Sequence, residues 1–437
     1  MAAMKVLMFG WEFPPHISGG LGTACYGLTK GLAGFDDIEV TFVVPRAYGD
    51  EDQSTIQLIG ANNIPVTKKK IYFEDIQKKI DYYEVSSEII PYIGPDEFWE
   101  LKSKRYSKKA RFVETDEGAK IKFSGKYGDN LYQEIRDYAL VAEVIADNNE
   151  FDLIHAHDWL AYPAGIAAKR VSGKPLVIHV HATDFDRSGG SANPQVYAME
   201  REGMEAADQI ITVSNLTRSI VIEKYGIDPG KITTVYNAVE QVSDEQKVAL
   251  KKGVNEKIVT FLGRITMQKG PEYFVEAAHQ VLQKTGNIRF VMAGSGDMMN
   301  SMIARAAQLK ISDKFHFTGF LKGDDVFQMF KMSDVFVMPS VSEPFGIVPL
   351  EAMQSNVPVI ISNQSGVAEI LKFAIKIDFW DTNAMADAIY ALVNYPSLSN
   401  FFKTFGKEEV ESLRWKNSAK NVRNIYYKAL GIAPVNT

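Results

Sequence analysis

The chain has 437 residues, a formal charge of −6 and one cysteine, Cys25. Its length exceeds what a single hydrophobic core usually supports, so we expect two domains. The acidic balance argues against bulk binding of nucleic acid, which needs a basic surface. One cysteine excludes a disulfide framework and a cysteine metal cluster. We find no signal peptide and no membrane span in the sequence, and we expect a cytoplasmic protein.

The first predicted strand, at 5–9, leads through a loop into Gly19 and Gly20 and then into an amphipathic helix that ends near Leu32. Glycine lets backbone N–H groups approach a phosphate closely, so this strand, turn and helix suit a phosphate ligand. The turn lacks the G-x-G-x-x-G pattern, which weakens a dinucleotide-binding interpretation. For the two glycines alone, an ordinary strand-to-helix loop is the simpler alternative.

A second strand is predicted at 40–44, and the regular alternation is then lost between about 50 and 128. This insertion mixes lysines with tyrosine, phenylalanine and tryptophan residues, a composition that suits stacking on sugars or binding of nucleic acid. A solvated insertion with its own small core is the simpler interpretation. If the insertion has a direct role, we expect it to hold an acceptor.

After a helix predicted at 131–148, two strands carry polar groups at their carboxyl ends, the edge where open α/β sheets bind ligands. Asp158 and Trp159 end the first, and alternation places His179 and His181 on one face of the second. The histidines of these strands suggest zinc, but no helical H-x-x-x-H pair accompanies them. We expect at least one histidine to satisfy core hydrogen bonds, and we favour His181 as the functional one.

A strand at 209–213 precedes a helix that we expect Ser214 to cap and Gly226 to close. The polar stretch 240–256 is the predicted linker between domains. The second half of the chain restarts with an apolar strand at 257–262.

Arg264 and Lys269 follow that strand and precede a helix that begins at Pro271. Two cations beside the free N–H groups of a helix N-terminus predict a diphosphate site. Isolated surface cations are the plainer alternative for this pair.

A short buried strand at 335–339 leads into Glu343, and a helix follows with Pro349 in its first turn, where the missing N–H needs no partner. Glu343, ahead of the helix, is free to face a ligand held at the helix N-terminus. Glu351, inside the helix, suits a pair of ribose hydroxyls. Acidic residues near helix starts are also common as dipole partners, so one such residue alone would mean little.

The sequence Glu343-Pro344-Phe345-Gly346, with Glu351 at the eighth position, resembles the Glu-x7-Glu motif of retaining glycosyltransferases of family four, which have the GT-B architecture. Gly19, Gly20 and Leu21 resemble the Gly-Gly-Leu loop of glycogen and starch synthases. Ile17 is a departure, because those enzymes often carry a lysine at this position. The segments around Asp158 and His181 are also similar to glycogen synthases.

The resemblance implies site residues throughout the chain. Those expected to act in catalysis are His181, Glu343, Arg264 and Lys269. The expected nucleotide-sugar site comprises Gly19, Gly20, Leu21, Arg264, Lys269, Gly294, Phe320, Leu321, Phe345, Gly346, Ile347 and Glu351. Asp158, Trp159 and Arg187 are expected along the path of the sugar or acceptor. No metal is expected, because fixed cations would replace it.

For the fold, the resemblance implies an α/β protein with two Rossmann-like doubly wound domains that face each other across a cleft. We place the first domain at 1–240, the second at 241–414, and a C-terminal helix that crosses back to the first domain at 415–437. The implied reaction moves glucose from ADP-glucose or UDP-glucose to an α-1,4-glucan with retention of the anomeric configuration.

Three alternatives stay open. A related transferase can use another acceptor, such as a small sugar, a sugar phosphate or a lipid. A non-catalytic carbohydrate-binding protein is disfavoured by the presence of Glu343, Arg264 and Lys269, and a nucleotide-dependent dehydrogenase by the missing G-x-G-x-x-G turn. The sequence does not separate ADP from UDP donors, and it says nothing of oligomeric state or allosteric control.

Overall fold

The computed structural model describes residues 3–16, 19–66, 112–115, 118–128, 130–241 and 254–433. Most of the predicted insertion and of the predicted linker therefore lies outside the described residues, as does Ile17. The chain divides into two compact units. Unit 1 comprises Met1–Ile178, Glu205–Asp208 and Tyr426–Thr437, and unit 2 comprises His179–Met204 and Gln209–Ile425.

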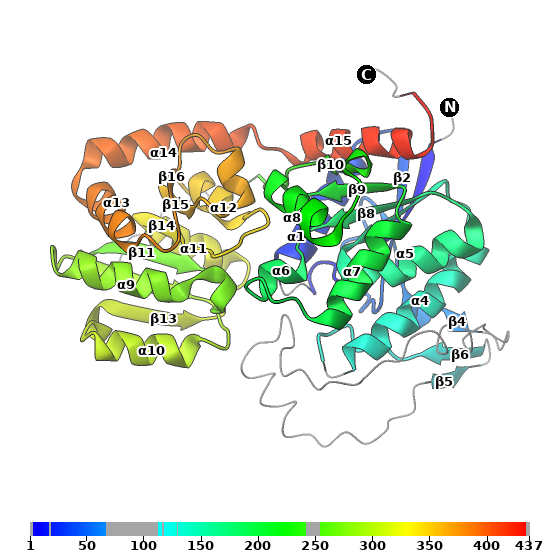
Figure 1. Cartoon of the computed structure of the whole chain (residues 1–437), viewed down its shortest axis with the longest axis horizontal. Coiled ribbons are helices and arrows are strands. Elements are labelled where there is room, and N and C mark those ends of the chain that lie inside the picture. The colour runs from blue at the N-terminus through cyan, green and yellow to red at the C-terminus, as the bar shows by residue number, and fades with distance from the viewer. Residues whose placement is uncertain are drawn as a thin grey trace. The chain divides into compact units, whose positions relative to one another are not determined.

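The first sheet has the strand order β10-β9-β8-β7-β1-β2-β3. Figure 1 labels its strands β10, β9, β8 and β2. Its strands are β1 (Met4–Phe9), β2 (Ile38–Val44), β3 (Gln57–Gly60), β7 (Leu153–His157), β8 (Leu176–Val180), β9 (Gln209–Thr212) and β10 (Ile232–Thr234). β1 pairs in parallel with both β2 and β7. Parallel strands need crossover connections, and helices provide them here except between β2 and β3, which a loop joins.

The helices between these strands are α1 (Gly20–Leu32), α4 (Leu131–Asn148), α5 (Asp158–Ser172), α6 (Asp184–Arg187), α7 (Pro194–Ala206) and α8 (Asn215–Tyr225), with 3-10 turns η1 (Ala61–Asn63) and η2 (Pro229–Lys231). A small antiparallel sheet contains β4 (Pro65–Val66), β6 (Gly118–Ile121) and β5 (Phe112–Thr115). Ser214 accepts a hydrogen bond from the backbone N–H of Thr217, and Gly226 ends α8 in the left-handed conformation. Both predicted caps of this helix are confirmed.

The second sheet has the order β13-β12-β11-β14-β15-β16, and its neighbouring strands are all parallel. Its strands are β11 (Lys257–Leu262), β12 (Ile288–Ala293), β13 (Phe315–Gly319), β14 (Val335–Met338), β15 (Val359–Ser362) and β16 (Ile375–Ile377). The helices are α9 (Pro271–Leu282), α10 (Met299–Gln308), α11 (Asp324–Met332), α12 (Val348–Gln354), α13 (Thr382–Asn394), α14 (Pro396–Glu411) and α15 (Trp415–Ala429), with 3-10 turns η4 (Met267–Lys269), η5 (Ser312–Lys314) and η6 (Gly366–Glu369). Two mostly parallel sheets with crossover helices confirm the predicted α/β class.

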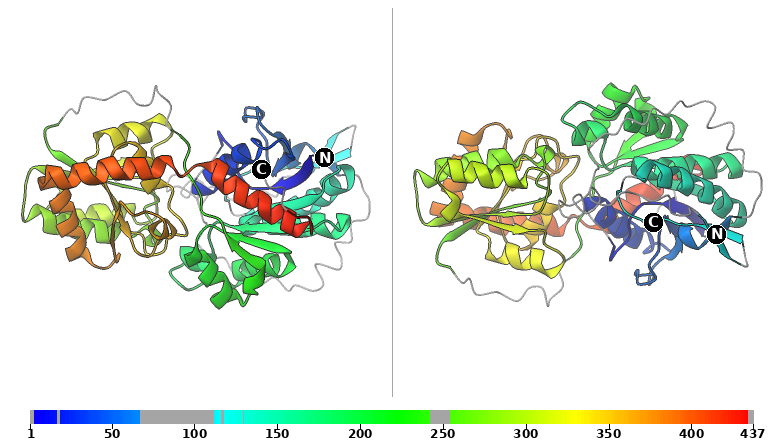
Figure 2. Two further views of the ribbon diagram at one scale, coloured as in Figure 1. Left: turned by 90° about the horizontal axis from the view of Figure 1, so that it is seen from above. Right: turned by 90° about the horizontal axis from the view of Figure 1, so that it is seen from below.

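Alternation along β14 shows why helices cover both faces of the second sheet. Val335 and Val337 belong to a core shared with α9, α10 and α13. Phe336 and Met338 belong to a second core shared with α11, α12 and α14. Successive side chains of a strand point to opposite faces, so a strand apolar at every position needs cover on both. The views in Figure 2 show helices on the two faces of this sheet.

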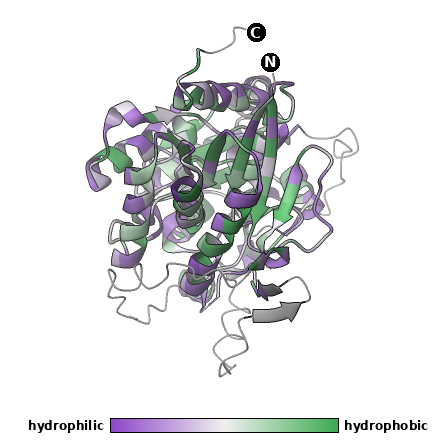
Figure 3. Cartoon of the chain, turned by 90° about the vertical axis from the view of Figure 1, so that its right-hand side faces the viewer, coloured by the Kyte–Doolittle hydropathy of each residue, from purple (hydrophilic) through white to green (hydrophobic). Residues whose placement is uncertain are grey.

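The hydropathy colouring in Figure 3 shows strands that are mostly hydrophobic and helices that carry both kinds of residue. Cys25 is buried in α1, which fits the simple packing role that a lone cysteine usually has. Among the described residues, no helix combines the length and the apolar character that crossing a membrane requires.

Tyr138 of α4 fixes the carboxyl ends of β1 and β2. Its side chain is fully buried, and its hydroxyl donates to the carbonyl oxygens of Gly10 at 3.0 Å and Val43 at 2.7 Å. Burial raises the pKa of this phenol well above its usual value, so the hydroxyl keeps its proton. Helix α4 is therefore hydrogen-bonded to the sheet edge at which the chain leaves β1 toward Gly19 and Gly20.

We predict that Tyr138→Phe destabilises unit 1 by about 1–3 kcal/mol, because two buried carbonyl oxygens lose a donor. Hydrogen exchange of peptides from β1 and β2, together with urea unfolding, measures the change. Tyr395→Phe is the matched control, because that side chain is 59% exposed. Equal exchange and equal unfolding midpoints in the two variants would contradict the anchoring role.

Candidate active site

Lys269 and Glu343 meet at the carboxyl ends of two neighbouring strands. Lys269 ends the 3-10 turn that follows β11, and Glu343 lies in the loop after β14, the strand paired with β11. The ammonium of Lys269 lies 2.5 Å from Oε2 of Glu343, and both side chains are largely buried. The hydroxyl of Ser340 donates to the same oxygen at 3.2 Å. The structure therefore brings together two of the predicted catalytic residues.

Arg264 is connected to this pair through Gln268, a residue that the sequence analysis did not single out. An Nη of Arg264 donates to Oε1 of Gln268 at 2.8 Å, and Nε2 of Gln268 donates to the carbonyl oxygen of Ser342 at 3.1 Å. The backbone of Gln268 also accepts from the N–H of Val341 at 2.9 Å. Gln268 is only 4% exposed, so it acts as a buried link between the loop of the two cations and the loop of Glu343. In the sequence, this linking role was indicated by the position of Gln268 between the two predicted cations, Arg264 and Lys269.

The glycines after β12 allow the loops at this sheet edge to approach. Gly294 has a φ of +135°, and a Cβ there would lie 1.8 Å from the carbonyl oxygen of Gly263. A Cβ on Gly296 would lie 2.2 Å from the carbonyl oxygen of Ile265. The loop that carries Arg264 therefore runs against backbone that has no room for a side chain.

The backbone of Glu343 is fixed before α12 begins. Its N–H donates to the carbonyl oxygen of Gln364 at 2.9 Å, and its own carbonyl oxygen accepts from Gly366 at 2.9 Å. Phe345 is buried, Gly346 has a φ of +101°, and Ile347 directly precedes the helix. These contacts hold Glu343 in the loop ahead of α12, where the sequence predicted it.

Glu351 lies in the first turn of α12. Burial raises the pKa of its carboxyl group to about 7. Near neutral pH this group is partly protonated and can both donate and accept hydrogen bonds, which suits a hydroxyl-rich ligand.

The loop after β8 is tied to the loop of Glu343. His181, 9% exposed, stacks on His179 with ring centroids 4.2 Å apart, which confirms that the two histidines share a face. Asp186 accepts from the N–H and hydroxyl of Thr183 with one oxygen, each at 2.8 Å, and from the hydroxyl of Ser342 at 2.6 Å with the other. Asp186 thus links the histidine loop to the residue next to Glu343.

Arg187 is engaged in a buried network. Its guanidinium lies 3.2 Å from Glu200 and donates to the carbonyl oxygen of Ala182 at 3.2 Å. The hydroxyl of Tyr225 also donates to Glu200. Burial is the main cause that raises the pKa of Glu200 to about 7, although Arg187 opposes the shift. The structure pairs Arg187 with protein groups, and its contact with a sugar stays a prediction.

The other predicted residues occupy strand ends or loops. In unit 2, Phe320 is 54% exposed just after β13, with Leu321 beside it. In unit 1, Gly19 precedes α1 with extended backbone, and Gly20 and Leu21 begin that helix. The remaining two, Asp158 and Trp159, begin α5 and are buried, and Asp158 has a φ of +58°. The ligand roles of all these residues stay predictions.

Comparisons with known proteins give consistent results. Residues 242–409 match the family model described as glycosyl transferases group 1, and residues 113–241 match that of glycosyltransferase family 4. Alpha-maltose-1-phosphate synthase of Mycolicibacterium smegmatis is 30% identical over 63% of this chain and 79% of the relative. Glycogen synthase of Mycobacterium tuberculosis is 24% identical over 98% of this chain and 95% of the relative.

Among solved structures, sucrose-phosphate synthase from Thermosynechococcus elongatus superimposes with a TM-score of 0.69. The similarity covers 98% of this chain and 99% of that chain at 16% sequence identity. At this level of identity the likeness concerns the fold, and it matches the two-sheet architecture described above.

We predict that Gly296→Ala destabilises unit 2 by about 1–3 kcal/mol, because the new Cβ forces the 263–266 backbone to move. Gly286→Ala is the matched control, since a Cβ there meets no atom within 4 Å. Thermal unfolding and hydrogen exchange of the 263–270 peptide measure the effect. If both alanine variants behave alike, the close approach is not as tight as the structure shows.

We predict that His181 makes unit 2 less stable as the pH falls below 6.5. Burial lowers the pKa of His181 from 6.5 to about 3, so between these values the unfolded chain binds a proton that the folded chain does not. Stability then rises with pH across this window, by at most about 1.4 kcal/mol per pH unit for one proton. His181→Gln should flatten this slope between pH 6.5 and 4.5 in urea unfolding.

The exposed His316 of the same unit provides the control for this pH series. His316→Gln should keep the slope of the parent chain. If the unfolding free energy changes with pH equally in the parent chain and in His181→Gln, the pKa of His181 is not lowered in the folded state.

Proposed function

The chain belongs to the family-four glycosyltransferases of GT-B architecture and is a hexosyltransferase; on that premise we propose that it transfers glucose from ADP-glucose or UDP-glucose to the non-reducing end of an α-1,4-glucan, with retention of the anomeric configuration. The single observation that carries the proposal is the contact of Lys269 with Glu343 at 2.5 Å, linked to Arg264 through Gln268. This arrangement places cationic and anionic groups side by side in one largely buried site.

The charges fit the needs of glycosyl transfer. The bond between the anomeric carbon and the donor phosphate breaks, and the leaving diphosphate takes the electron pair. An acceptor hydroxyl oxygen forms the new bond to that carbon and gives up its proton. Negative charge grows on the diphosphate while positive charge grows on the sugar ring. We propose that Arg264 and Lys269 stabilise the diphosphate.

Glu343 has two roles in this proposal. Its carboxylate fixes the ammonium of Lys269, and it faces the sugar, where it orients hydroxyls and favours the developing positive charge. His181 binds the same sugar through hydrogen bonds rather than charge, because its lowered pKa keeps the imidazole neutral at neutral pH. The proposed ribose ligand of the donor is Glu351. The proposal includes no metal ion, because the two side-chain cations supply the positive charge.

Two classes of acceptor have support. A glucan is supported by the 24% identity with a glycogen synthase over nearly the whole chain. A sugar phosphate is the second candidate, since the names of two similar proteins, alpha-maltose-1-phosphate synthase and sucrose-phosphate synthase, each specify a phosphorylated sugar. The cytoplasmic location expected from the sequence stays a prediction.

We predict that Glu343→Gln and Lys269→Gln each lower glucose transfer by roughly 10²–10³-fold, because each removes charge that the transition state needs. Release of ADP or UDP from the two nucleotide-glucoses, with and without an oligoglucan primer, measures donor turnover. Product analysis of the primer measures transfer. Circular dichroism and unfolding midpoints show whether each variant is folded.

Lys257→Gln is the matched control for charge removal. Lys257 forms an ion pair with Asp334 at 3.3 Å in the same unit, and its side chain is 47% exposed, so the pair contributes little. Near-parental transfer by folded Lys269→Gln or Glu343→Gln would remove the proposed site. Donor turnover without primer extension would retain the site and reject the glucan as acceptor.

A further inference from the structure

Unit 2 contains a buried carboxylate, Asp186, that the proposed chemistry does not use. Asp186 is 1% exposed and lies in α6, the short helix after His181. Its two carboxylate oxygens accept hydrogen bonds from segments that are far apart in the sequence. A carboxylate is costly to bury unless its oxygens accept hydrogen bonds, so each of these contacts restrains the group that donates to it.

One oxygen of Asp186 holds the backbone of the loop that carries His181. Oδ2 accepts from the backbone N–H of Thr183 at 2.8 Å and from its hydroxyl at 2.8 Å. The guanidinium of Arg187 donates to the carbonyl oxygen of Ala182 at 3.2 Å. The two residues that directly follow His181 are therefore both held by side chains of α6.

The other oxygen of Asp186 reaches the loop of Glu343. Oδ1 accepts from the hydroxyl of Ser342 at 2.6 Å, across 156 positions of the sequence. Ser342 directly precedes Glu343, and its carbonyl oxygen accepts from Nε2 of Gln268 at 3.1 Å. Because the contacts at the start of α6 use Oδ2, the bond of Oδ1 adds a separate function, which is to tie the loop of His181 to the loop of Glu343.

These hydrogen bonds form a path from a predicted phosphate-binding cation to the loop after β8. Arg264 donates to Gln268 at 2.8 Å, and Gln268 donates to the carbonyl oxygen of Ser342. The hydroxyl of Ser342 donates to Asp186, which accepts from Thr183. The loop of the two cations, the loop before α12 and the loop after β8 are therefore joined in that order.

A packing contact joins the segment around α6 to the loop of the cations as well. Gly189, just after α6, has a φ of +65°, and a Cβ there would lie 2.4 Å from Cε of Met267. Met267 begins the 3-10 turn η4, which lies between Arg264 and the end of that turn at Lys269. The α6 segment thus contacts one loop of the proposed site through Asp186 and the other through Gly189.

We propose that Asp186 is a positioning residue for glycosyl transfer, which holds His181 and Glu343 in the relative placement in which both contact one donor sugar. This role rests on the proposed function, which assigns both side chains to that sugar. Asp186 acts through the backbone of two loops and not through contact with the sugar. Placement matters to the rate, because a displacement of about 1 Å at a reacting centre can cost roughly 10²-fold.

The experiment measures kcat for nucleotide-glucose turnover together with the affinity for ADP or UDP by calorimetry. Ser342→Ala removes the bond between the loops and leaves the contacts of Asp186 with Thr183, whereas Asp186→Ala removes both. Each variant should lower kcat roughly 10–100-fold, with nucleotide affinity within about twofold of the parent chain, because misplacement of the sugar leaves the diphosphate contacts in place. The double variant should be no slower than Asp186→Ala, since the bond is already absent.

Asp186→Asn separates positioning from the charge of the carboxylate. The amide oxygen can accept from Thr183, and the amide NH₂ can donate to the hydroxyl oxygen of Ser342. This variant should therefore restore most of the kcat that Asp186→Ala loses. If Asp186→Asn is as slow as Asp186→Ala while both are folded, the hydrogen-bonded link is not what the reaction requires.

Two matched controls lie in the same unit. Asp381 accepts from the N–H of Ala384 at 2.9 Å at the start of α13, so Asp381→Ala removes a helix cap alone. Ser412 donates its hydroxyl to the carbonyl oxygen of Glu409 at an exposed position, so Ser412→Ala removes a local bond alone. Both variants should keep the parental kcat, although Asp381→Ala should lower the unfolding midpoint.

Hydrogen exchange measures the link between the loops without turnover. Ser342→Ala should speed exchange in the 181–187 peptide, and Ser412→Ala should not. Parental exchange in that peptide, or parental kcat in folded Ser342→Ala, overturns the positioning role. A parent chain without donor turnover would instead overturn the proposed function and the role that rests on it, even if exchange shows that the two loops are linked.

Discussion

The parallel pairing of β11 with β14 is the constraint on which the candidate active site depends. It places the loops after these strands side by side, so that Lys269 and Glu343, 74 positions apart, meet at 2.5 Å. A largely buried ion pair gains Coulomb energy but loses hydration, so it contributes little net stability compared with apolar packing. Its value here lies in presenting a fixed cation and a fixed carboxylate to a ligand. Electrostatic catalysis needs such groups in place before the reaction begins.

Hydrogen bonds extend this arrangement through unit 2. Ser342 donates to Asp186, which caps the short helix after His181. Elsewhere in the unit, Glu369 accepts from the N–H groups of Asn215 and Leu216, the first residues of α8, at 2.9 and 2.8 Å. Both contacts use carboxylates at helix N-termini, where backbone donors and the helix dipole favour negative charge. Each of these two carboxylates therefore ties a loop of unit 2 to a helix N-terminus.

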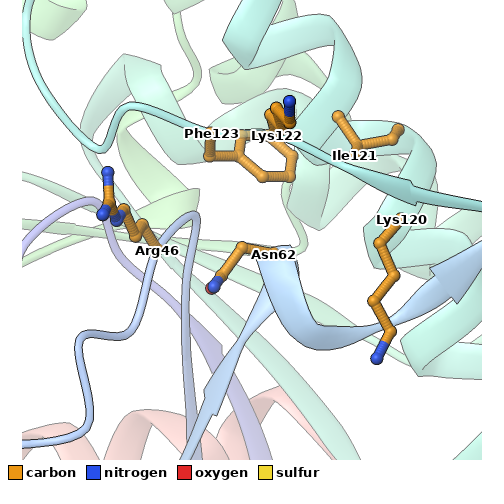
Figure 4. Close-up of a pocket in the computed structure, with 6 residues that line it drawn as sticks. All are labelled: Arg46, Asn62, Lys120, Ile121, Lys122 and Phe123. Carbon is orange, nitrogen blue, oxygen red and sulfur yellow. The ribbon is translucent and has the colours of Figure 1, made fainter. Parts of the chain in front are cut away.

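Net charge describes this protein poorly at the scale of its sites. The chain carries a formal charge of −6, yet the described residues that line a hollow in unit 1 (Figure 4) include three cations and no carboxylate: Arg46, Asn62, Lys120, Ile121, Lys122 and Phe123. Burial also changes the acidity of individual carboxyl groups. It raises the pKa of Glu351 and Glu200 to about 7, but only Glu200 has an arginine that opposes the shift. Local burial and hydrogen bonding, rather than total charge, decide which ligand each site favours.

The sequence by itself determined the alternation of strands and helices, the caps of α8, the shared face of His179 and His181, and the family signature that ends in Glu351. These features depend on neighbours a few positions apart, whose spacing translates directly into a strand face or a helix turn. Only the tertiary structure showed that Gln268 links Arg264 to the loop of Glu343 and that Asp186 accepts from Ser342. It also paired Arg187 with Glu200 and assembled the hollow around Arg46. Each of these contacts joins side chains brought together by chain folding, and neither periodicity nor residue type specifies which loops will meet.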